Sequence, residues 1–384
     1  EIMDDNRLKQ QKSFQHKCPN CGATLRFDPA SGSLLCDHCG GKVQFDQSVD
    51  VQERDFSDLA TFSRWDDGDV ATYRCYNCGA VTVAPRTAIA TTCPYCNSPV
   101  VIDDKTGSLV KPDSLIPFQL TAKQAAQQLS RWRKRRLFAP NKFRKHTRED
   151  SVKGVFVPAW TFDATTTSSY NGTVGIRKTR TVRRNGKTYT ESYIDWVPVS
   201  GVIDNTFDDV FIRANGNIPE KYFRALQPFP KQNYRVYSNE FVAGYIADHY
   251  TLEPLDAFSQ AKMQMEQKIR RDILWRYGAD VEGTLNVEMR FLSKSFKYMM
   301  VPVYVAATKY NKKVYNQYVS GIFSDDKQHS KVCGKAPVSP WKVLLTVLAG
   351  IAVIAGIVLL YNYLGDSNPV DIWEDFPEWY SFLK

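Results

Sequence analysis

Eight cysteines in the N-terminal part of the chain are the residues whose type and spacing could do chemistry. They form four Cys-x-x-Cys pairs, and each pair can wrap a tight loop around one metal ion. A glycine that permits such a turn follows three of the pairs. The pairs group into two quartets with identical internal intervals: Cys18, Cys21, Cys36 and Cys39, then Cys75, Cys78, Cys93 and Cys96. The repeated spacing indicates an internal duplication of a metal-binding unit.

Each quartet predicts one structural Zn²⁺ in a tetrahedral shell of four thiolates, which leaves no open position for a substrate. The sequence therefore predicts two structural zinc ions as cofactors. We expect each ion to sit on a short hairpin, with strands at 25–27 and 33–35 in the first unit and at 81–83 and 89–92 in the second. Three alternatives remain: a disulfide framework, rubredoxin-like iron, and a cross-braced arrangement in which the quartets exchange pairs.

Near the C-terminus, residues 343–364 run without a charged side chain. At about 1.5 Å per residue, a helix of this length reaches roughly 33 Å, which is enough to cross a hydrocarbon core of about 30 Å. A buried core helix is the alternative, but such helices are rarely apolar on every face. We expect a transmembrane helix over 341–364. Ala349, Ala352 and Gly356 share one of its faces and offer a small-residue track for helix packing.

The charges that flank this segment predict its orientation. Residues 327–342 contain lysines, among them Lys335 and Lys342, and no acid, whereas the tail 365–384 is acidic and aromatic. Lysine and arginine beside a span stay in the cytoplasm, so the large N-terminal part should be cytoplasmic and the tail outside. Thiolates in that reducing compartment bind metal rather than pair. Cys333 is expected to be an ordinary free thiol, with lipidation as the alternative.

Between ribbons and span we expect an α+β, β-rich body. A helix from Thr121 to Phe138, a strand at 154–163 and a hairpin around Asn185-Gly186 are followed by a similar series: a helix from Glu253, a strand at 298–307 and a turn at Asn311-Lys312. This order predicts two repeats. The expected organisation is lead-in 1–15, ribbon 16–44, linker 45–70, ribbon 71–102, body 103–324, juxtamembrane linker 325–340, span 341–364 and tail 365–384.

The formal net charge of +9 includes a basic patch at the end of the first body helix. Its members are Arg131, Arg133, Lys134, Arg135 and Arg136. A solvated helix end, anionic lipid and nucleic acid are the alternatives for this patch, and charge alone does not choose among them. Gly186-Lys187-Thr188 is not a phosphate loop, because Thr181 stands where a Walker motif needs glycine. No nucleophile or carboxylate pair marks a catalytic site, so we expect a protein without enzymatic activity.

The order of these parts resembles the bacterial membrane-anchored double zinc-ribbon proteins, a family with transcription factor IIB-type ribbons that is often labelled as related to a primosomal helicase. This sequence has no Walker A or acidic ATPase motif. The resemblance covers most of residues 15–325. It is carried by the cysteine quartets, Ile116-Pro-Phe118, Trp132 to Arg136 with Ala139-Pro140, Gly154 to Asp163, Trp196 to Gly201 and Phe207-Asp-Asp209.

The resemblance implies a non-enzymatic scaffold or adaptor at the cytoplasmic face of the bacterial inner membrane. Its implied partners are a flotillin-like (SPFH) protein, a similar double-ribbon membrane protein and a phage-shock protein A-type membrane-stress factor. The alternative function is a membrane-tethered nucleic-acid-binding protein, which the basic hairpin and ribbons would serve.

Overall fold

A computed structural model describes most of the chain. The described residues are 16–61, 64–65, 70–75, 77–85, 90–96, 98–101, 109–110, 112–144, 151–311, 313–324 and 329–364. The expected lead-in and the expected extracytoplasmic tail lie outside them. The chain divides into two compact units, Glu1–Trp132 with His146–Lys335, and Arg133–Lys145 with Ala336–Lys384, and each is described by itself.

The first ribbon is a small antiparallel sheet of β1 (Leu25–Asp28), β2 (Ser33–Cys36) and β3 (Lys42–Val43). Leu25 lies opposite Cys36, and Asp28 lies opposite Ser33. The Asp28 carboxylate accepts hydrogen bonds from the backbone N–H and the hydroxyl of Ser31, which closes the turn between the strands. The predicted first hairpin is therefore confirmed.

The second ribbon pairs its strands differently from our expectation. β6 (Val70–Arg74) pairs with β7 (Val81–Pro85), and β8 (Ala90–Thr92) pairs with β9 (Pro99–Val101). The expected pairing of 81–83 with 89–92 was wrong. Each cysteine pair reverses the chain, so the strands that enter and leave one pair become neighbours. The sequence showed strand-like runs but did not show which of them would meet.

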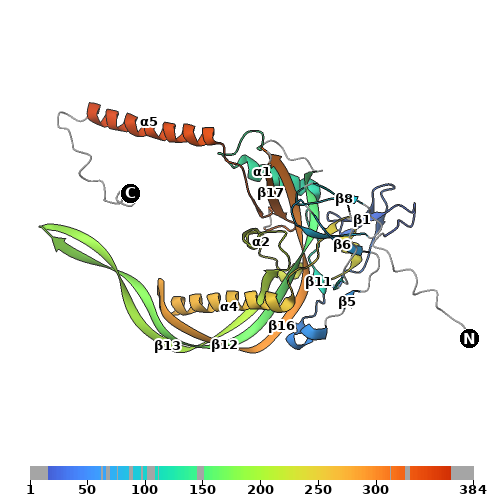
Figure 1. The fold of residues 1–384 in the computed structure, drawn as a ribbon, viewed down its shortest axis with the longest axis horizontal. Helices are drawn as coiled ribbons and strands as arrows, with labels where there is room; N and C mark the ends of the chain where they lie inside the picture. The colour runs from blue at the N-terminus through green and yellow to red at the C-terminus, as the bar shows by residue number, and fades with distance from the viewer. Residues whose placement is uncertain are drawn as a thin grey trace, which may run out of the picture. The chain divides into compact units, whose positions relative to one another are not determined.

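The body of the first unit is a nine-stranded sheet with the path β13-β12-β16-β11-β14 among the described residues. Three very long strands form it: β12 (Lys153–Arg184), β13 (Lys187–Arg213) and β16 (Val281–Tyr310). β12 is antiparallel to both neighbours. The predicted Asn185-Gly186 turn joins β12 to β13, with φ of +53° and +78° as a type I′ turn requires. Figure 1 shows the long strands as one curved ribbon with α4 (Pro254–Arg276) on its concave side.

The core lies around the segment of the sheet in which the first part of β12 pairs with the last part of β16. Trp160, Tyr298 and Tyr304 are almost fully buried there. Val157 lies opposite Val301 in this paired segment. Two short strands also pair with it: β11 (Ser114–Leu115) runs parallel to β16, and β15 (Ile246–Ala247) runs parallel to β12. α4 covers the sheet with the predicted stripe, every member of which is buried: Ala257, Ala261, Met265, Ile269 and Ile273.

The other described elements are short. In chain order they are β4 (Arg54–Asp55), η1 (Phe56–Thr61), β5 (Arg64–Trp65), β10 (Leu109–Val110), α1 (Ala122–Lys134), α2 (Glu220–Leu226), η3 (Lys231–Asn233), β14 (Arg235–Val236), α3 (Asn239–Val242), β17 (Lys313–Ser320) and β18 (Val332–Gly334).

α1 begins at a capping box in which Thr121 and Gln124 bond each other reciprocally. It ends earlier than Phe138, because a run of like charges followed by Pro140 does not sustain another helical turn.

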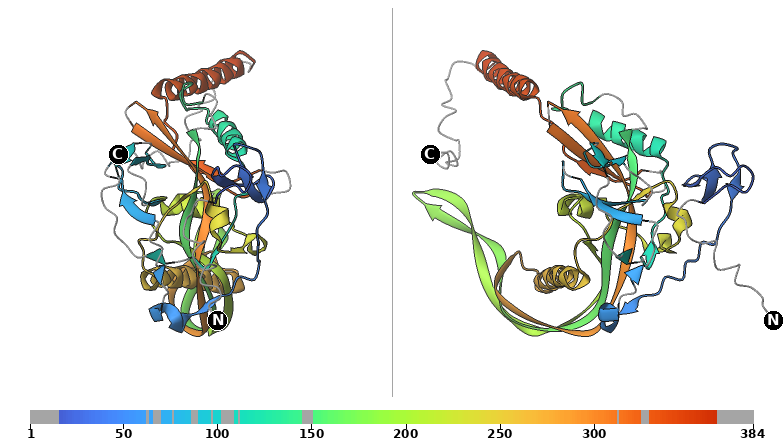
Figure 2. Two further views of the ribbon diagram at one scale, coloured as in Figure 1. Left: turned by 90° about the vertical axis from the view of Figure 1, so that its right-hand side faces the viewer. Right: turned by 45° about the vertical axis from the view of Figure 1, so that its right-hand side comes forward.

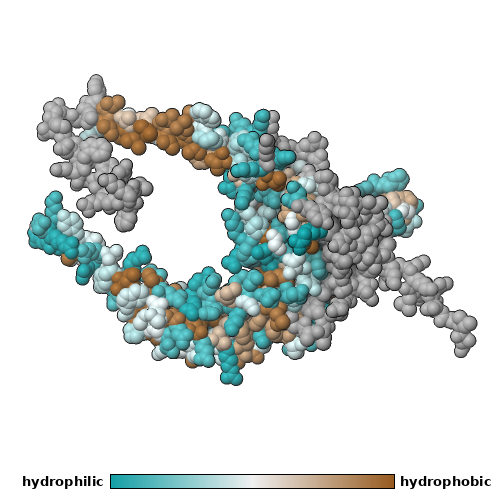
Figure 3. Space-filling model, in the orientation of Figure 1, coloured by the Kyte–Doolittle hydropathy of each residue, from teal (hydrophilic) through white to brown (hydrophobic). Residues whose placement is uncertain are grey.

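The second unit contains α5 (Pro340–Leu364), which is long and apolar enough to be a candidate membrane span. No described side chain from Val343 to Tyr361 is buried, and Figure 3 shows its surface as apolar. The three small residues of the predicted packing track, Ala349, Ala352 and Gly356, all lie on this helix. At its start, the Lys342 ammonium donates to the carbonyl of Ala139 at 2.8 Å.

Candidate metal centres

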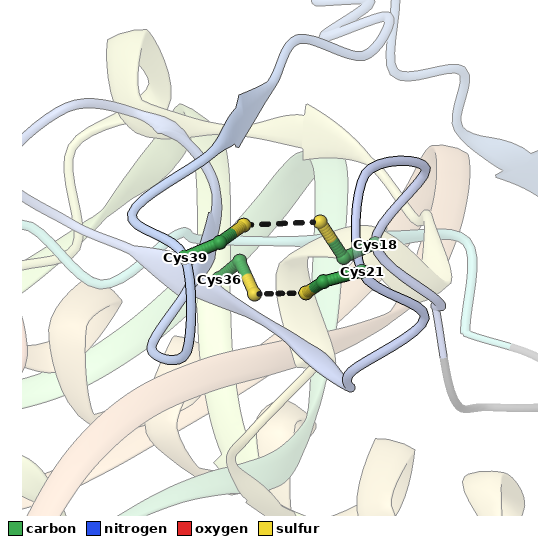
Figure 4. Close-up of side chains that lie close together, drawn as sticks. All are labelled: Cys18, Cys21, Cys36 and Cys39. Carbon is green, nitrogen blue, oxygen red and sulfur yellow. Dashed lines mark hydrogen bonds between the residues drawn. The ribbon is translucent and has the colours of Figure 1, made fainter.

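The first cysteine quartet forms one compact sulfur cluster. All four Sγ atoms lie within 4.8 Å of one another, with 3.6 Å between Cys18 and Cys39 and 3.5 Å between Cys21 and Cys36 (Figure 4). A tetrahedral ion with bonds of about 2.3 Å places its sulfurs roughly 3.8 Å apart, whereas a disulfide needs about 2.05 Å. The geometry therefore fits a metal shell, and the four cysteines are free thiols.

Glycine and backbone N–H groups shape these ligand loops. Gly22 and Gly40 have φ of +74° and +72°, and each donates its N–H to the carbonyl of the first cysteine of its pair. These are left-handed conformations that residues with a Cβ seldom adopt. The N–H groups of Cys39 and His38 point to the sulfur of Cys36 and lower the pKa of its thiol to about 6, against the effect of burial. That thiol is thus ready to bind a cation as a thiolate.

The second quartet repeats this arrangement. Cys75 and Cys96 lie 3.6 Å apart, as do Cys78 and Cys93, and the four ligand atoms again lie within 4.8 Å of one another. Burial raises the pKa of Cys96, but hydrogen bonds from Asn77 and Ser98 outweigh it and lower the pKa to about 6.

The predicted ligands thus meet as two self-contained quartets, so the disulfide and cross-braced alternatives do not fit. Both clusters could hold a metal ion, and four thiolates suit zinc. Rubredoxin-like iron uses the same ligands, so the donor set does not identify the metal. The two four-cysteine clusters indicate a double zinc-ribbon-like protein.

The first ribbon packs against the body through aromatic rings. The Phe27 N–H donates to the carbonyl of Ala243 at 2.9 Å. The Phe27 and Phe241 ring centroids lie 5.3 Å apart in an edge-on arrangement, and Phe45 packs on Phe241 at 4.8 Å. Gly244 has φ of +85°, and a Cβ there would approach the Cβ of Arg26 to 2.6 Å. The packing of these aromatic rings holds the first ribbon, and with it the first cysteine quartet, against α3.

The second ribbon is attached by buried polar groups. Asn217 bonds both the N–H and the carbonyl of Val81, at 3.1 and 2.8 Å. Tyr95, between the ligands Cys93 and Cys96, donates its hydroxyl to the Asp248 carboxylate, which also accepts from Asn217 at 2.8 Å. Asp248 is fully buried, and burial raises its pKa to about 7. This anchor was not predicted, because nothing near residue 248 in the sequence points to the cysteines.

A buried charged group in the body was also missed. The Lys297 ammonium, in a side chain only 3% exposed, lies 3.0 Å from Glu53, 3.0 Å from Asp209 and 3.9 Å from Asp163. We call these four residues the Lys297 cluster. The half-exposed Lys231 joins it from η3. Asp163 and Asp209 end two stretches that the sequence singled out, but only the register of β12, β13 and β16 brings them to Lys297.

Electrostatics in the Lys297 cluster favour a charged lysine. Burial lowers the pKa of Lys297, but the carboxylates of Asp209 and Asp163 outweigh burial and raise it. Burial raises the pKa of Asp163 to about 7, and hydrogen bonding by Asp163, Ser295 and Lys297 lowers that of Glu53 to about 2. Glu53 precedes β4, which pairs with β16. The cluster therefore ties the segment between the ribbons to the sheet.

The predicted basic patch does not form one exposed surface. Arg131, Lys134, Arg135 and Arg136 are exposed, but Arg133 is buried with its guanidinium 4.9 Å from the ring centroid of Phe143. Burial lowers the pKa of Arg133 to about 10. Its packing role could not be read from a run of like charges.

Cys333 is half-buried in β18, and its Sγ lies 3.5 Å from the carbonyl of Tyr222. Burial raises the pKa of its thiol to about 12, which makes it a poor nucleophile.

The chain is similar to the uncharacterized protein YdjG of Bacillus subtilis (strain 168). The two are 26% identical over 336 residues, which cover 86% of this chain and 92% of the relative. No family model matches the chain, and no solved structure matches it significantly. The similarity therefore covers most of this chain but carries no activity.

Proposed function

We propose that this protein is a membrane-anchored adaptor that assembles with a partner protein at the cytoplasmic face of the bacterial cell membrane. The observation that carries the proposal is a pair of closed four-cysteine clusters attached to one β body. A shell of four thiolates supplies structure rather than a reactive position, so the zinc ions shape surfaces and perform no reaction. The apolar helix α5 supplies the anchor.

The proposed cytoplasmic orientation of the body rests on the charges beside the apolar helix, and the proposed partners rest on the family resemblance. Lys335 and Lys342 precede the apolar segment, which supports a cytoplasmic body. The transcription factor IIB-type ribbon resemblance supports a flotillin-like (SPFH) partner, a second double-ribbon membrane protein and a phage-shock protein A-type factor. The small residues on α5 would let such a second span approach closely.

We also propose that the body arose by duplication. The series β11-α1-β12-β13 has the same order as β15-α4-β16-β17. Around the opposed pair Val157 and Val301, Phe156 faces Pro302 and Pro158 faces Met300. β11 runs parallel to β16 and β15 parallel to β12, so each short strand joins the long strand of the other series. This reciprocal pairing supports two repeats related by an approximate two-fold axis.

Affinity capture tests the adaptor proposal. The zinc-loaded chain is purified in detergent and used to capture proteins from solubilised bacterial membranes, with Cys36→Ser as the ribbon variant and Cys333→Ser as the matched control. We expect an SPFH-type protein to be enriched by wild type and by Cys333→Ser and lost with Cys36→Ser. Enrichment of nucleoprotein, with direct nucleic-acid binding that falls steeply with salt, would instead establish the nucleic-acid-binding alternative.

A further inference from the structure

The outer part of the β12–β13 hairpin extends past the rest of its sheet (Figure 2). β16 pairs with β12 only as far as Gly175, opposite Val281, and residues 176–195 continue as two strands alone. We call these residues the distal hairpin. Its base is held by Asp280, whose carboxylate accepts from the Arg177 N–H at 2.8 Å and whose own N–H donates to the carbonyl of Gly175 at 2.9 Å. At about 3.3 Å per residue, the distal hairpin is roughly 30 Å long.

The distal hairpin is strongly basic. Both of its acids already lie beside cations: Asp195 is 2.6 Å from Lys178, and Glu191 is 3.1 Å from Arg180 and 3.4 Å from Arg184. Its cations outnumber these two acids by four: Arg177, Lys178, Arg180, Arg183, Arg184 and Lys187. Every one of these cations is exposed. The free end of the hairpin therefore presents a positive potential to whatever it meets.

Aromatic side chains share a face with several of these cations. The register places Tyr193 opposite Lys178 and Tyr189 opposite Val182, on the same face as Arg184 and Lys187. The two tyrosines are 41% and 50% exposed. Tyrosine rings with a polar tip suit the headgroup region of a bilayer, and lysine and arginine suit its phosphates.

We propose that the distal hairpin docks on the anionic phospholipid headgroups of the bilayer that α5 spans. The inference rests on the proposed function only for the presence of that anchor. The hairpin is several times longer than the screening length of about 8 Å, so its tip meets a charged surface independently of the body. Anchoring in the same bilayer raises the effective lipid concentration near the tip, which favours lipid over a partner that must arrive from solution.

A vesicle flotation assay with the whole chain tests whether the distal hairpin docks on anionic phospholipid. The chain is held in a nanodisc of phosphatidylcholine and mixed with vesicles made either of phosphatidylcholine or of equal parts phosphatidylcholine and phosphatidylglycerol. The variant Arg183→Gln/Lys187→Gln removes two exposed charges beside the Asn185-Gly186 turn. The matched control, Lys309→Gln/Lys313→Gln, removes two exposed lysines around the turn that joins β16 to β17.

We expect wild type to float with the anionic vesicles but not with the neutral ones. At about fivefold per charge, the double variant should lose roughly 25-fold in partition coefficient, and the control should bind like wild type. Equal binding to both kinds of vesicle, or wild-type binding by the Arg183→Gln/Lys187→Gln variant, would overturn the proposal. Tighter, variant-sensitive binding to duplex DNA would overturn it in favour of nucleic acid.

Two further measurements separate this proposal from the adaptor. Two zinc ions per chain in the double variant show that the ribbons remain folded. If lipid docking fails while SPFH capture persists, the hairpin proposal is wrong and the adaptor stands. If SPFH capture fails while lipid docking persists, the adaptor proposal is wrong and the hairpin proposal stands.

Discussion

The replacement Tyr95→Phe tests how the second ribbon is attached to the body. The change removes one hydroxyl from a side chain that is only 2% exposed, and it leaves the ring in place. That hydroxyl donates to the fully buried Asp248 carboxylate, which also accepts from Asn215 at 3.3 Å and Asn217 at 2.8 Å. Because no cavity larger than an oxygen atom forms, the cost comes from the lost hydrogen bond alone.

The magnitude depends on whether Asp248 is ionised. Its folded pKa of about 7 lies above the usual carboxyl value, so this group stabilises the fold most when protonated, and that contribution is lost as pH rises through about 7. A hydrogen bond to a carboxylate contributes about 1.5–3 kcal/mol, and one to a neutral acceptor contributes about 1 kcal/mol. Tyr95→Phe should therefore cost about 2 kcal/mol at pH 8 and about 1 kcal/mol at pH 6.

Urea unfolding of the zinc-loaded full chain in detergent, followed by circular dichroism at both pH values, measures this difference. Tyr189→Phe is the matched control, because its ring lies half-exposed on the distal hairpin, and it should change neither value. An equal loss at pH 6 and pH 8, or no loss at pH 8, would refute the view that Asp248 ionises beside Tyr95 and anchors the ribbon.

Three further predictions concern other parts of the chain. Cys78→Ser should reduce bound zinc from two ions per chain to one by elemental analysis, whereas Cys333→Ser should retain both; two ions in Cys78→Ser would contradict the ligand set. Lys297→Met removes the buried cation of the Lys297 cluster and should cost about 3–5 kcal/mol in urea unfolding, against about 1 kcal/mol or less for the half-exposed Lys231→Met. Gly356→Leu should weaken association in a membrane-dimerisation assay, and unchanged association would remove the packing role of the small-residue face.

The sequence by itself determined the features that depend on neighbours close in the chain. A cysteine pair and its following glycine specify a ligand loop within a few residues, so both quartets could be identified from spacing. The Asn185-Gly186 turn and the buried stripe of α4 follow equally local rules, namely positive φ and helical periodicity. An uncharged run longer than a bilayer core is likewise visible in composition alone.

Only the tertiary structure decided which distant segments meet. The Tyr95–Asp248 anchor and the Lys297 cluster each join residues far apart in sequence. Arg133 turns inward against Phe143 rather than outward with its neighbours. Such contacts depend on strand register, which is set by the packing of the whole core at once. A shift of one residue would turn every side chain to the opposite face, and no local pattern contains that information.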